Sequence, residues 1–177
     1  MINKEQLGGN AQRIEEIDPL RGMWRVRFGL ESGENGTQTS LFADFDHRPT
    51  DSELIHLITE YYDTECDTEC EWGMKYKDMV VNLSFENKFN FKAAFDLALY
   101  SQGKNLPITF KLWQDEKTPV YWTFKTLDEL TEFYMAAMQH VSNTLNKWWA
   151  KKDREIMRLI EGYKPLTRDK IEKGGEQ

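Results

Sequence analysis

The sequence is poor in cysteine and has no long apolar run. Two cysteines, Cys66 and Cys70, are too few to build a disulfide framework, so we expect both to be reduced thiols. No stretch approaches the ~20 apolar residues that a helix needs to cross a bilayer. Met1 to Asp18 also lacks the charged head and apolar body of a signal peptide. We therefore expect a chain that is made and folded in a cytoplasm and has no membrane partner.

Positive charge is in deficit. The chain carries 23 Lys and Arg against 30 Asp and Glu, which gives a formal net charge of -7 and a pI near 5.1. Binding along a phosphate backbone depends on many Lys and Arg side chains that neutralise phosphates and release counterions. The charge balance therefore argues against a nucleic-acid partner.

The sequence motifs of common enzymes are missing as well. There is no glycine-rich phosphate loop, no G-x-S-x-G and no H-E-x-x-H. The three histidines, His47, His56 and His140, are far apart in the sequence, and none lies near a serine or cysteine motif that would make it a catalytic base. We therefore expect no catalytic residues and no cofactor.

Two metal-site patterns are incomplete. Cys66 and Cys70 would share a helix face and could bind zinc with His56, but a structural zinc site takes four ligands and no second Cys or His pair follows. The alternating acids around the cysteines resemble a calcium loop. Its required glycine is replaced by Thr68 and its final acid by Met74. We expect no bound metal.

The densest apolar segment runs from Met79 to Trp113 and predicts a strand, a helix and a second strand. Ser84 or Asn90 is the expected N-terminal cap of the helix, and Gly103 is placed to end it in the left-handed conformation. The strand after it alternates apolar and polar residues. Apolar residues at the i, i+3, i+4, i+7 and i+8 spacing predict the buried face of the helix: Phe91, Ala94, Phe95, Ala98 and Leu99.

Turn and capping signals predict the elements before this segment. Met23 to Phe45 alternates apolar and polar residues around an Asn35-Gly36 turn signal, which predicts a hairpin. Thr50 and Glu53 form a capping box, which predicts a helix from there to at least Tyr62. The tandem copy DTECDTEC that follows either extends this helix or forms a loop.

A second hairpin and a long helix complete the prediction. Val120 to Lys125 alternates and pairs with the preceding strand, and Thr126 and Glu129 form another capping box. Apolar steps of three and four then continue, and no Gly or Pro occurs before Gly162. This helix could run ~35 residues, or ~52 Å. That is longer than one small domain requires, so we expect part of it to pack on another subunit.

Together these elements predict an α+β fold. The expected order is ββαβαββα over 22–162, a single domain with about five antiparallel or mixed strands covered by helices. Residues 1–21 and 163–177 are predicted to be extended terminal arms. Residues 51–71 hold eight acids and no Lys or Arg, whereas 147–173 hold nine Lys or Arg and five acids. Such an asymmetry could pair copies head to tail, so we expect a homo-oligomer.

Aromatic residues make up 13% of the chain, and the six tryptophans are more than one core face accommodates. Tryptophan is enriched at the anchors of protein interfaces. Capping the core is an equally good interpretation for any one of them. The long helix offers further apolar positions. The interface candidates are therefore Trp24, Trp113, Trp148, Trp149, Tyr134, Val141, Leu145, Ile156 and Leu159.

Residues 80–98, VVNLSFENKFNFKAAFDLA, resemble the segment S-x-E-N-Q-F-N-Y-K-A-A-Y-D-L-A of a domain of unknown function found in tailed phages and prophages of gut bacteria, crAss-like phages among them. LPITFKLW, PVYWTFKTLDELTEFY and TLNKWWAKKD extend the resemblance over roughly half of the chain. Lys88 replaces a glutamine of the pattern, and Phe91 and Phe95 replace tyrosines. The matching residues are Ser84, Glu86, Asn87, Phe89, Asn90, Lys92, Ala93, Ala94, Asp96, Leu97 and Ala98.

The resemblance implies a virion or assembly protein of the phage tail or its fibres, with no known catalytic residues. We therefore expect a non-enzymatic structural or adaptor protein of the virion, in the tail, tail-fibre or head-tail region, which assembles in the host cytoplasm. Its expected partners are other phage structural proteins and copies of itself. Two alternatives stay open: an assembly chaperone for tail fibres that leaves before the particle matures, and a carbohydrate-binding module or hydrolase that uses exposed tryptophans and carboxylates.

Overall fold

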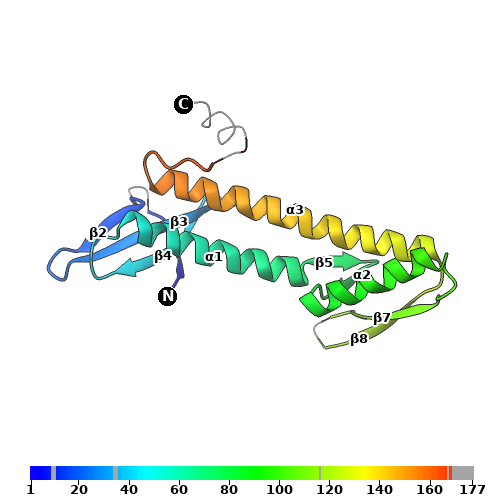
Figure 1. Ribbon diagram of the computed structural model, residues 1–177. Helices are drawn as coiled ribbons and strands as arrows, with labels where there is room; N and C mark the ends of the chain where they lie inside the picture. The colour runs from blue at the N-terminus through cyan, green and yellow to red at the C-terminus, as the bar shows by residue number, and fades with distance from the viewer. Residues whose placement is uncertain (9–10, 34–35, 116, 167, 169–177) are drawn as a thin grey trace, which may run out of the picture. The chain divides into compact units, whose positions relative to one another are not determined.

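Eight strands and three helices make up the described part of the chain (Figure 1). The structure is a computed structural model and describes residues 1–8, 11–33, 36–115, 117–166 and 168. The helices are α1 (Asp51–Trp72), α2 (Phe85–Tyr100) and α3 (Leu127–Leu159). The strands are β1 (Asn3–Gln6), β2 (Ile14–Asp18), β3 (Met23–Ser32), β4 (Gln38–Phe45), β5 (Met74–Tyr76), β6 (Met79–Val81), β7 (Ile108–Trp113) and β8 (Pro119–Phe124).

The chain divides into two compact units. The first is Met1–Tyr62 with Ala150–Gln177, and the second is Asp63–Trp149. Helices α1 and α3 each contribute residues to both units. Among the described helices, none is long and apolar enough to cross a membrane.

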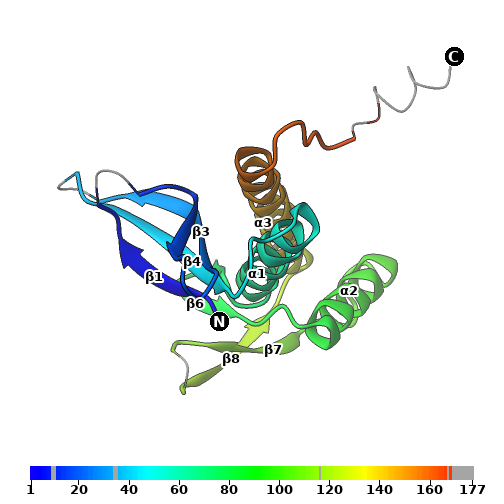
Figure 2. The ribbon, with the colours of Figure 1, turned by 90° about the vertical axis from the view of Figure 1, so that its left-hand side faces the viewer.

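The first unit contains an antiparallel sheet in the order β1-β4-β3-β2. Figure 2 shows β1, β4 and β3 of this sheet. Strands β3 and β4 form the hairpin that alternation predicts over Met23 to Phe45, and Val26 and Phe28 are fully buried on one face. Of the predicted turn, Asn35 lies outside the described residues, whereas Gly36 has φ +73°, a conformation that glycine adopts without steric cost.

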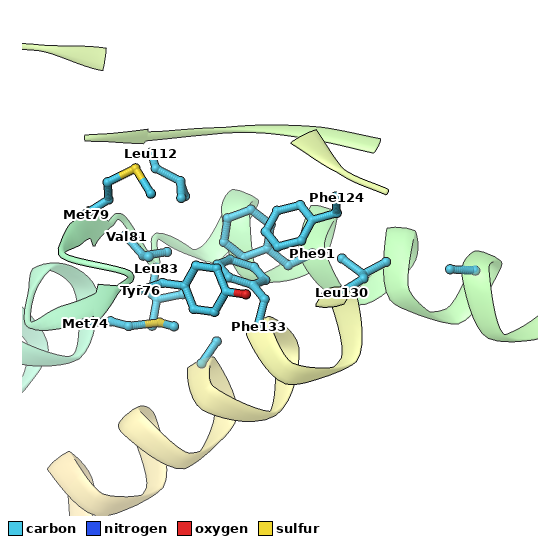
Figure 3. Packing of buried hydrophobic residues seen from close by; sticks show 12 residues of the cluster. Met74, Tyr76, Met79, Val81, Leu83, Phe91, Leu112, Phe124, Leu130 and Phe133 are labelled. Carbon is cyan, nitrogen blue, oxygen red and sulfur yellow. The ribbon is translucent and has the colours of Figure 1, made fainter. Parts of the chain in front are cut away.

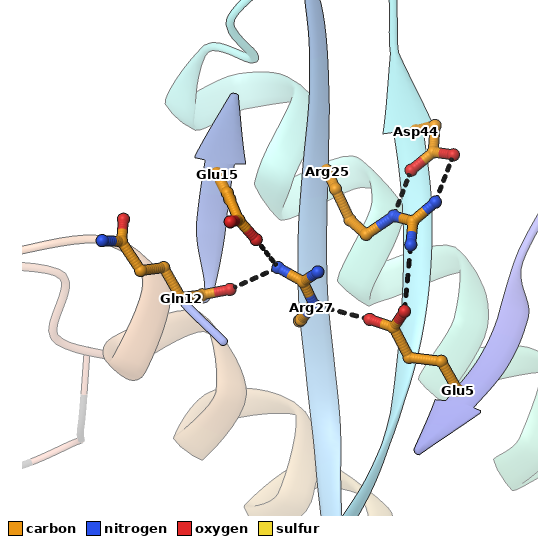
Figure 4. Close-up of polar contacts among 6 residues, drawn as sticks. All are labelled: Glu5, Gln12, Glu15, Arg25, Arg27 and Asp44. Carbon is orange, nitrogen blue, oxygen red and sulfur yellow. Dashed lines mark hydrogen bonds and ion pairs between the residues drawn. The ribbon is translucent and has the colours of Figure 1, made fainter. Parts of the chain in front are cut away.

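Two arginines of β3 hold the polar strands β1 and β2 in the sheet (Figure 4). Arg25 makes a bidentate pair with Asp44, at 2.7 and 2.9 Å, and also donates to Glu5 at 2.9 Å. Arg27 donates to Glu5 and to Glu15, both at 2.5 Å. The planar guanidinium suits such multiple pairing because its donors are fixed in a fork. Charged side chains therefore help to hold β1 and β2 in the sheet: Glu15 of β2 pairs with the adjacent β3, and Glu5 of β1 pairs with β3 across β4.

The α+β class is confirmed, but the predicted strand count is wrong. The sequence predicts about five strands in one sheet, and the structure has eight in two four-stranded sheets. The additional strands are β1, β2 and β5; the first two lie within 1–21, which the sequence predicts to be an arm. Residues 167 and 169–177 of the predicted C-terminal arm lie outside the described residues. The domain boundaries at 22 and 162 stay a prediction.

The second unit builds an antiparallel sheet in the order β5-β6-β7-β8 and the helix α2. Ser84 is the N-terminal cap of α2, since its hydroxyl accepts a hydrogen bond from the Asn87 amide at 3.4 Å. Gly103 follows the helix at φ +78° and donates its N–H to the Ala98 carbonyl. The N-terminal cap thus forms as the sequence predicts, whereas the first left-handed residue after the helix is Gln102, at φ +53°, and Gly103 follows it.

A cluster of aromatic rings occupies the core of this unit (Figure 3). Phe133 of α3 is fully buried, and its ring centroid lies 5.2 Å from that of Tyr76, 5.1 Å from Phe91, 5.8 Å from Phe110 and 4.9 Å from Phe124. Most of these pairs are edge-to-face or tilted, the arrangements that aromatic quadrupoles favour. Phe91 lies on the predicted buried face of α2, so this face attaches the helix to the sheet and to α3.

The DTECDTEC repeat extends α1, which runs to Trp72. Cys66 and Cys70 are buried at 4% and 8% exposure. Burial, reinforced by the neighbouring Cys70, raises the pKa of Cys66 to about 11, and burial also raises the pKa of Cys70. Both thiols are therefore protonated and poorly nucleophilic at neutral pH. Within the described ranges, no group of three or more His, Cys, Asp or Glu is placed to hold a metal ion.

The start of α1 carries a pH-sensitive cap. Glu53 accepts from the Thr50 amide at 2.8 Å and from the Thr50 hydroxyl at 2.8 Å, which completes the predicted capping box. These bonds, with a further one from His47 at 2.9 Å, lower the pKa of Glu53 to about 2. His47 also bonds Asp46 at 2.7 Å, and these two carboxylates raise the pKa of His47.

We expect the two titrations to act on the cap at opposite ends of the pH range. Because the pKa of His47 is raised, its bonds to Asp46 and Glu53 stabilise the folded state fully at a pH below about 6.5, its ordinary pKa. This stabilisation is lost as the pH rises through the pKa of the folded state. Because the pKa of Glu53 is lowered, the stability that its carboxylate adds to the folded state is present above pH 4.5 and is lost as the pH falls towards 2. NMR titration of His47 should give a pKa above its ordinary value, and Glu53→Gln should lower it. An unchanged His47 pKa in that variant would contradict this pairing.

Candidate interaction surfaces

Helix α2 is apolar on two faces. Phe91 and Ala98 are buried on the inner face, as predicted, although Leu99 of that predicted face is 48% exposed. The opposite face also presents apolar side chains, at steps of four, four, four and three residues. We call this set the α2 stripe: Phe85, Phe89, Ala93, Leu97 and Tyr100.

The α2 stripe is open to solvent over the length of the helix. Phe85 is 78% exposed, Phe89 66%, Leu97 57% and Tyr100 95%, and Ala93 is also exposed. Surface helices of globular proteins ordinarily place polar residues opposite their buried face. Single exposed apolar residues are common, but a row of them on one helix face is unusual, so the α2 stripe is a candidate interaction surface.

Charged residues border the α2 stripe in equal numbers of each sign. Glu86 and Asp96 are balanced by Lys88 and Lys92. The Lys92 ammonium and the Asp96 carboxylate form an ion pair four residues apart on the helix. The border is thus electrically neutral in a chain with a net charge of -7.

A groove lined by two tryptophans is the second surface of this unit. Trp72, at the end of α1, and Trp113, at the end of β7, border a hollow of about 490 Å³ together with Val80 and Asp115. The same tryptophans border an adjoining hollow of about 410 Å³. We call the two hollows the tryptophan groove. The second hollow is also lined by Asn82, Asn87, Asn90, Phe91, Thr109, Phe110 and Lys111.

Asparagine amides form the polar side of the tryptophan groove. Asn82 donates to the Glu71 carboxylate at 2.9 Å, and Asn87 donates to the Asn82 side-chain oxygen at 2.7 Å. The Asp115 carboxylate accepts from the Lys117 and Thr118 amides, both at 2.9 Å, and these bonds lower its pKa. The general acid of a glycosidase needs a raised pKa, so Asp115 is suited to form a turn and not to donate a proton.

Glu69 joins the end of α1 to α3 within the second unit. Its backbone carbonyl accepts from His140 at 2.9 Å, and its carboxylate accepts from the Trp148 indole at 2.8 Å and from the Lys147 ammonium. Burial alone would raise the pKa of Glu69, but the bonds from Lys147 and Trp148 outweigh it and lower the pKa. The acidic helix and the basic segment predicted from charge counts therefore meet inside one chain at this point.

The interface candidates predicted from the sequence occupy several environments. Trp149 is 51% exposed, whereas Ile156 is 2% exposed and lies inside its own chain. Tyr134 stacks on Phe95, with ring centroids 4.4 Å apart. The half-buried candidates are Trp24, Trp113, Trp148, Tyr134, Val141, Leu145 and Leu159. Trp113 borders the tryptophan groove, and Trp148 is held by Glu69.

Sequence reasoning missed the α2 stripe. The apolar residues at steps of four from Phe85 to Leu97 are visible in the sequence, but the neighbouring row from Phe91 to Leu99 has the same helical spacing. A helix with two apolar rows does not show which of them faces the core. The position of the sheet identifies the inner row.

Comparison with protein-family models, with curated proteins and with solved structures finds no match to this chain. The surfaces of the second unit and the sequence resemblance are therefore the basis for proposing a function.

Proposed function

We propose that this protein is a non-enzymatic structural or adaptor subunit that acts through protein-protein contacts. The observation that carries the proposal is the α2 stripe. Exposed aromatic rings are costly in water, since apolar surface gains roughly 25 cal/mol per Å² when it is buried. One face of α2 packs in the core, and the opposite face is apolar and exposed. This arrangement fits a subunit whose exposed face is covered by a partner in the assembly.

The assembly that we propose is a phage particle, in its tail, tail-fibre or head-tail region, formed in the host cytoplasm. The support is the resemblance of residues 80–98 to a domain of tailed phages and prophages. Three members of the α2 stripe, Phe89, Ala93 and Leu97, lie at matching positions of that pattern. The proposed partners are other particle proteins and further copies of this chain.

The test is to purify particles from a host that produces them and to identify their polypeptides by mass spectrometry. The wild-type chain should remain with the particles through density banding and washing. A Phe85→Ser/Phe89→Ser variant should fold but be depleted from them, because its α2 stripe is interrupted. Tyr121→Ser is the matched control: Tyr121 is 70% exposed on β8, outside the stripe, and this variant should be retained. Absence of the wild-type chain from particles would contradict a virion role.

An assembly chaperone would give a different result in the same experiment. It would bind a fibre protein in the lysate through the α2 stripe and be absent from finished particles. The proposal of a structural subunit would then be replaced by that of a chaperone.

A carbohydrate-binding role is the second candidate, because two indoles and three asparagine side chains border one groove. Indole faces and carboxamides are side chains that offer apolar contact and hydrogen bonds to a sugar. Trp72→Ala and Trp113→Ala should each abolish binding on a glycan array, whereas Phe85→Ser should not. An array on which the wild-type protein binds no glycan would remove this candidate.

A further inference from the structure

We propose that the α2 stripe binds the α2 stripe of a second copy, as an antiparallel helix pair whose two-fold axis passes Ala93. This inference rests on the proposed function, since it names the partner for the surface that carries it. A two-fold interface places one patch against an identical patch, so the patch must be complementary to itself. The α2 stripe meets this requirement in its order of residues, its charges and its area.

The order of side chains is close to symmetric about Ala93. Phe89 and Leu97 lie four residues on either side of it, and Phe85 and Tyr100 lie eight and seven residues away. In an antiparallel pair centred on Ala93, Phe89 therefore faces Leu97 of the second copy. Rows at steps of four that interdigitate give a crossing angle of about -50°, so the two axes are closest at the centre and diverge outwards. A small residue at the centre and large ones at both ends suit this geometry.

The charges that border the stripe also match across the axis. Lys92 and Asp96 lie on one side of the stripe, and the two-fold axis brings the same pair of the second copy to that side. Lys92 then lies about two residues along the axis from Asp96 of the second copy, or about 3 Å at 1.5 Å per residue. Opposite charges therefore meet at the centre. The two Glu86 side chains lie about 21 Å apart along the axis, so they do not repel each other at contact distance.

The exposed area reaches the lower limit for a dimer interface. A covered Phe or Tyr buries about 200 Å², so the exposed fractions of Phe85, Phe89 and Tyr100 correspond to about 480 Å² per copy. With Leu97 included, complete coverage in two copies would remove about 1,100 Å² from water, which exceeds the roughly 1,000 Å² minimum of a biological interface and lies in the size class of weak, reversible ones.

Disulfide trapping tests the pairing and its direction in the full chain. The native Cys66 and Cys70 are buried and protonated, so we expect no cross-link through them. If the wild-type chain does cross-link, both are replaced by serine. Ala93→Cys should form a cross-linked dimer under mild oxidation, because the two-fold axis brings its two copies within disulfide range. Glu86→Cys, on the same helix, should not, because its copies lie about 21 Å apart. Cross-linking of both variants would indicate a parallel pair and overturn the proposal.

Sedimentation equilibrium provides the second measurement. The wild-type chain should form a dimer at micromolar concentration, and Phe89→Ser/Leu97→Ser should raise its dissociation constant by about 30-fold or more, the loss typical of interface hot spots. Tyr121→Ser should leave it unchanged. A monomeric wild-type chain that still depends on the α2 stripe for incorporation into particles would overturn the dimer and leave the proposed function standing. If the dimer is disrupted by Phe89→Ser/Leu97→Ser but the chain is absent from particles, the dimer stands and the proposed virion function is overturned.

Discussion

Phe133→Ala is expected to lower the free energy of unfolding by about 3 to 5 kcal/mol. Phe133 is fully buried, and its ring packs against those of Tyr76, Phe91 and Phe124 (Figure 3). The ring of Phe110 lies 5.8 Å from it, between centroids. Truncation would remove the transfer free energy of the ring and leave a cavity that four other rings cannot fill without leaving their favoured packing. Urea denaturation followed by tryptophan fluorescence measures the change.

Phe85→Ala is the matched control, since it removes the same ring from a site that is 78% exposed. Its stability should change by less than about 0.5 kcal/mol. Equal losses in the two variants would mean that the ring of Phe85 is covered in the isolated chain, which would contradict the open α2 stripe. A loss of under 1 kcal/mol for Phe133→Ala would contradict the aromatic core.

Gly73→Ala is expected to lower the free energy of unfolding by about 2 to 3 kcal/mol. A Cβ atom at Gly73 would lie 2.5 Å from the backbone oxygen of Glu69, 2.8 Å from its Cγ and 3.1 Å from His140 Cε1. The same oxygen accepts hydrogen bonds from the Gly73 amide at 2.8 Å and from His140 at 2.9 Å. The clash therefore forces apart the contact that joins the end of α1 to α3. Chemical denaturation gives the energy, and the NMR shift of the His140 ring reports the local change.

Gly8→Ala separates this clash from the general effect of replacing a glycine. Apart from its neighbours in the chain, no described residue has an atom within 4 Å of a Cβ built at Gly8, so this variant should retain wild-type stability to within about 0.5 kcal/mol. Wild-type stability of Gly73→Ala, with an unchanged His140 resonance, would show that the chain after α1 takes another path.

Several elements could be predicted because their cause is local in sequence. The Thr50–Glu53 capping box, the Ser84 cap and the left-handed Gly103 each depend on groups within a few residues of one another. The alternation of apolar and polar residues in β3 and β4 is also a local signal, because successive side chains of a strand point to opposite faces of the sheet. Strands β1 and β2 could not be predicted in this way, since Glu5 and Glu15 pair with arginines that are distant in the chain.

The candidate surfaces, too, were predicted only in part from the sequence. The sequence indicated that apolar and aromatic residues exceed the needs of one core, and it identified Trp113 as a residue to be placed near a surface. It did not identify Trp72 as its neighbour across the tryptophan groove, because these residues are 41 positions apart (113 − 72) and meet only when β6 and β7 pair. Nor did it separate the two apolar rows of α2.

The amino-acid sequence by itself determined the α+β class, the capped starts of the helices and the two predicted hairpins, because caps, turns and alternation act between near neighbours. Tertiary structure decided which apolar row of α2 is buried, how eight strands are shared between two sheets, and which charged groups are paired. Those outcomes depend on contacts between residues far apart in the chain. The α2 stripe is exposed because the sheet and α3 cover the opposite side of the helix, and the hydrophobic effect then favours a partner on the side left open.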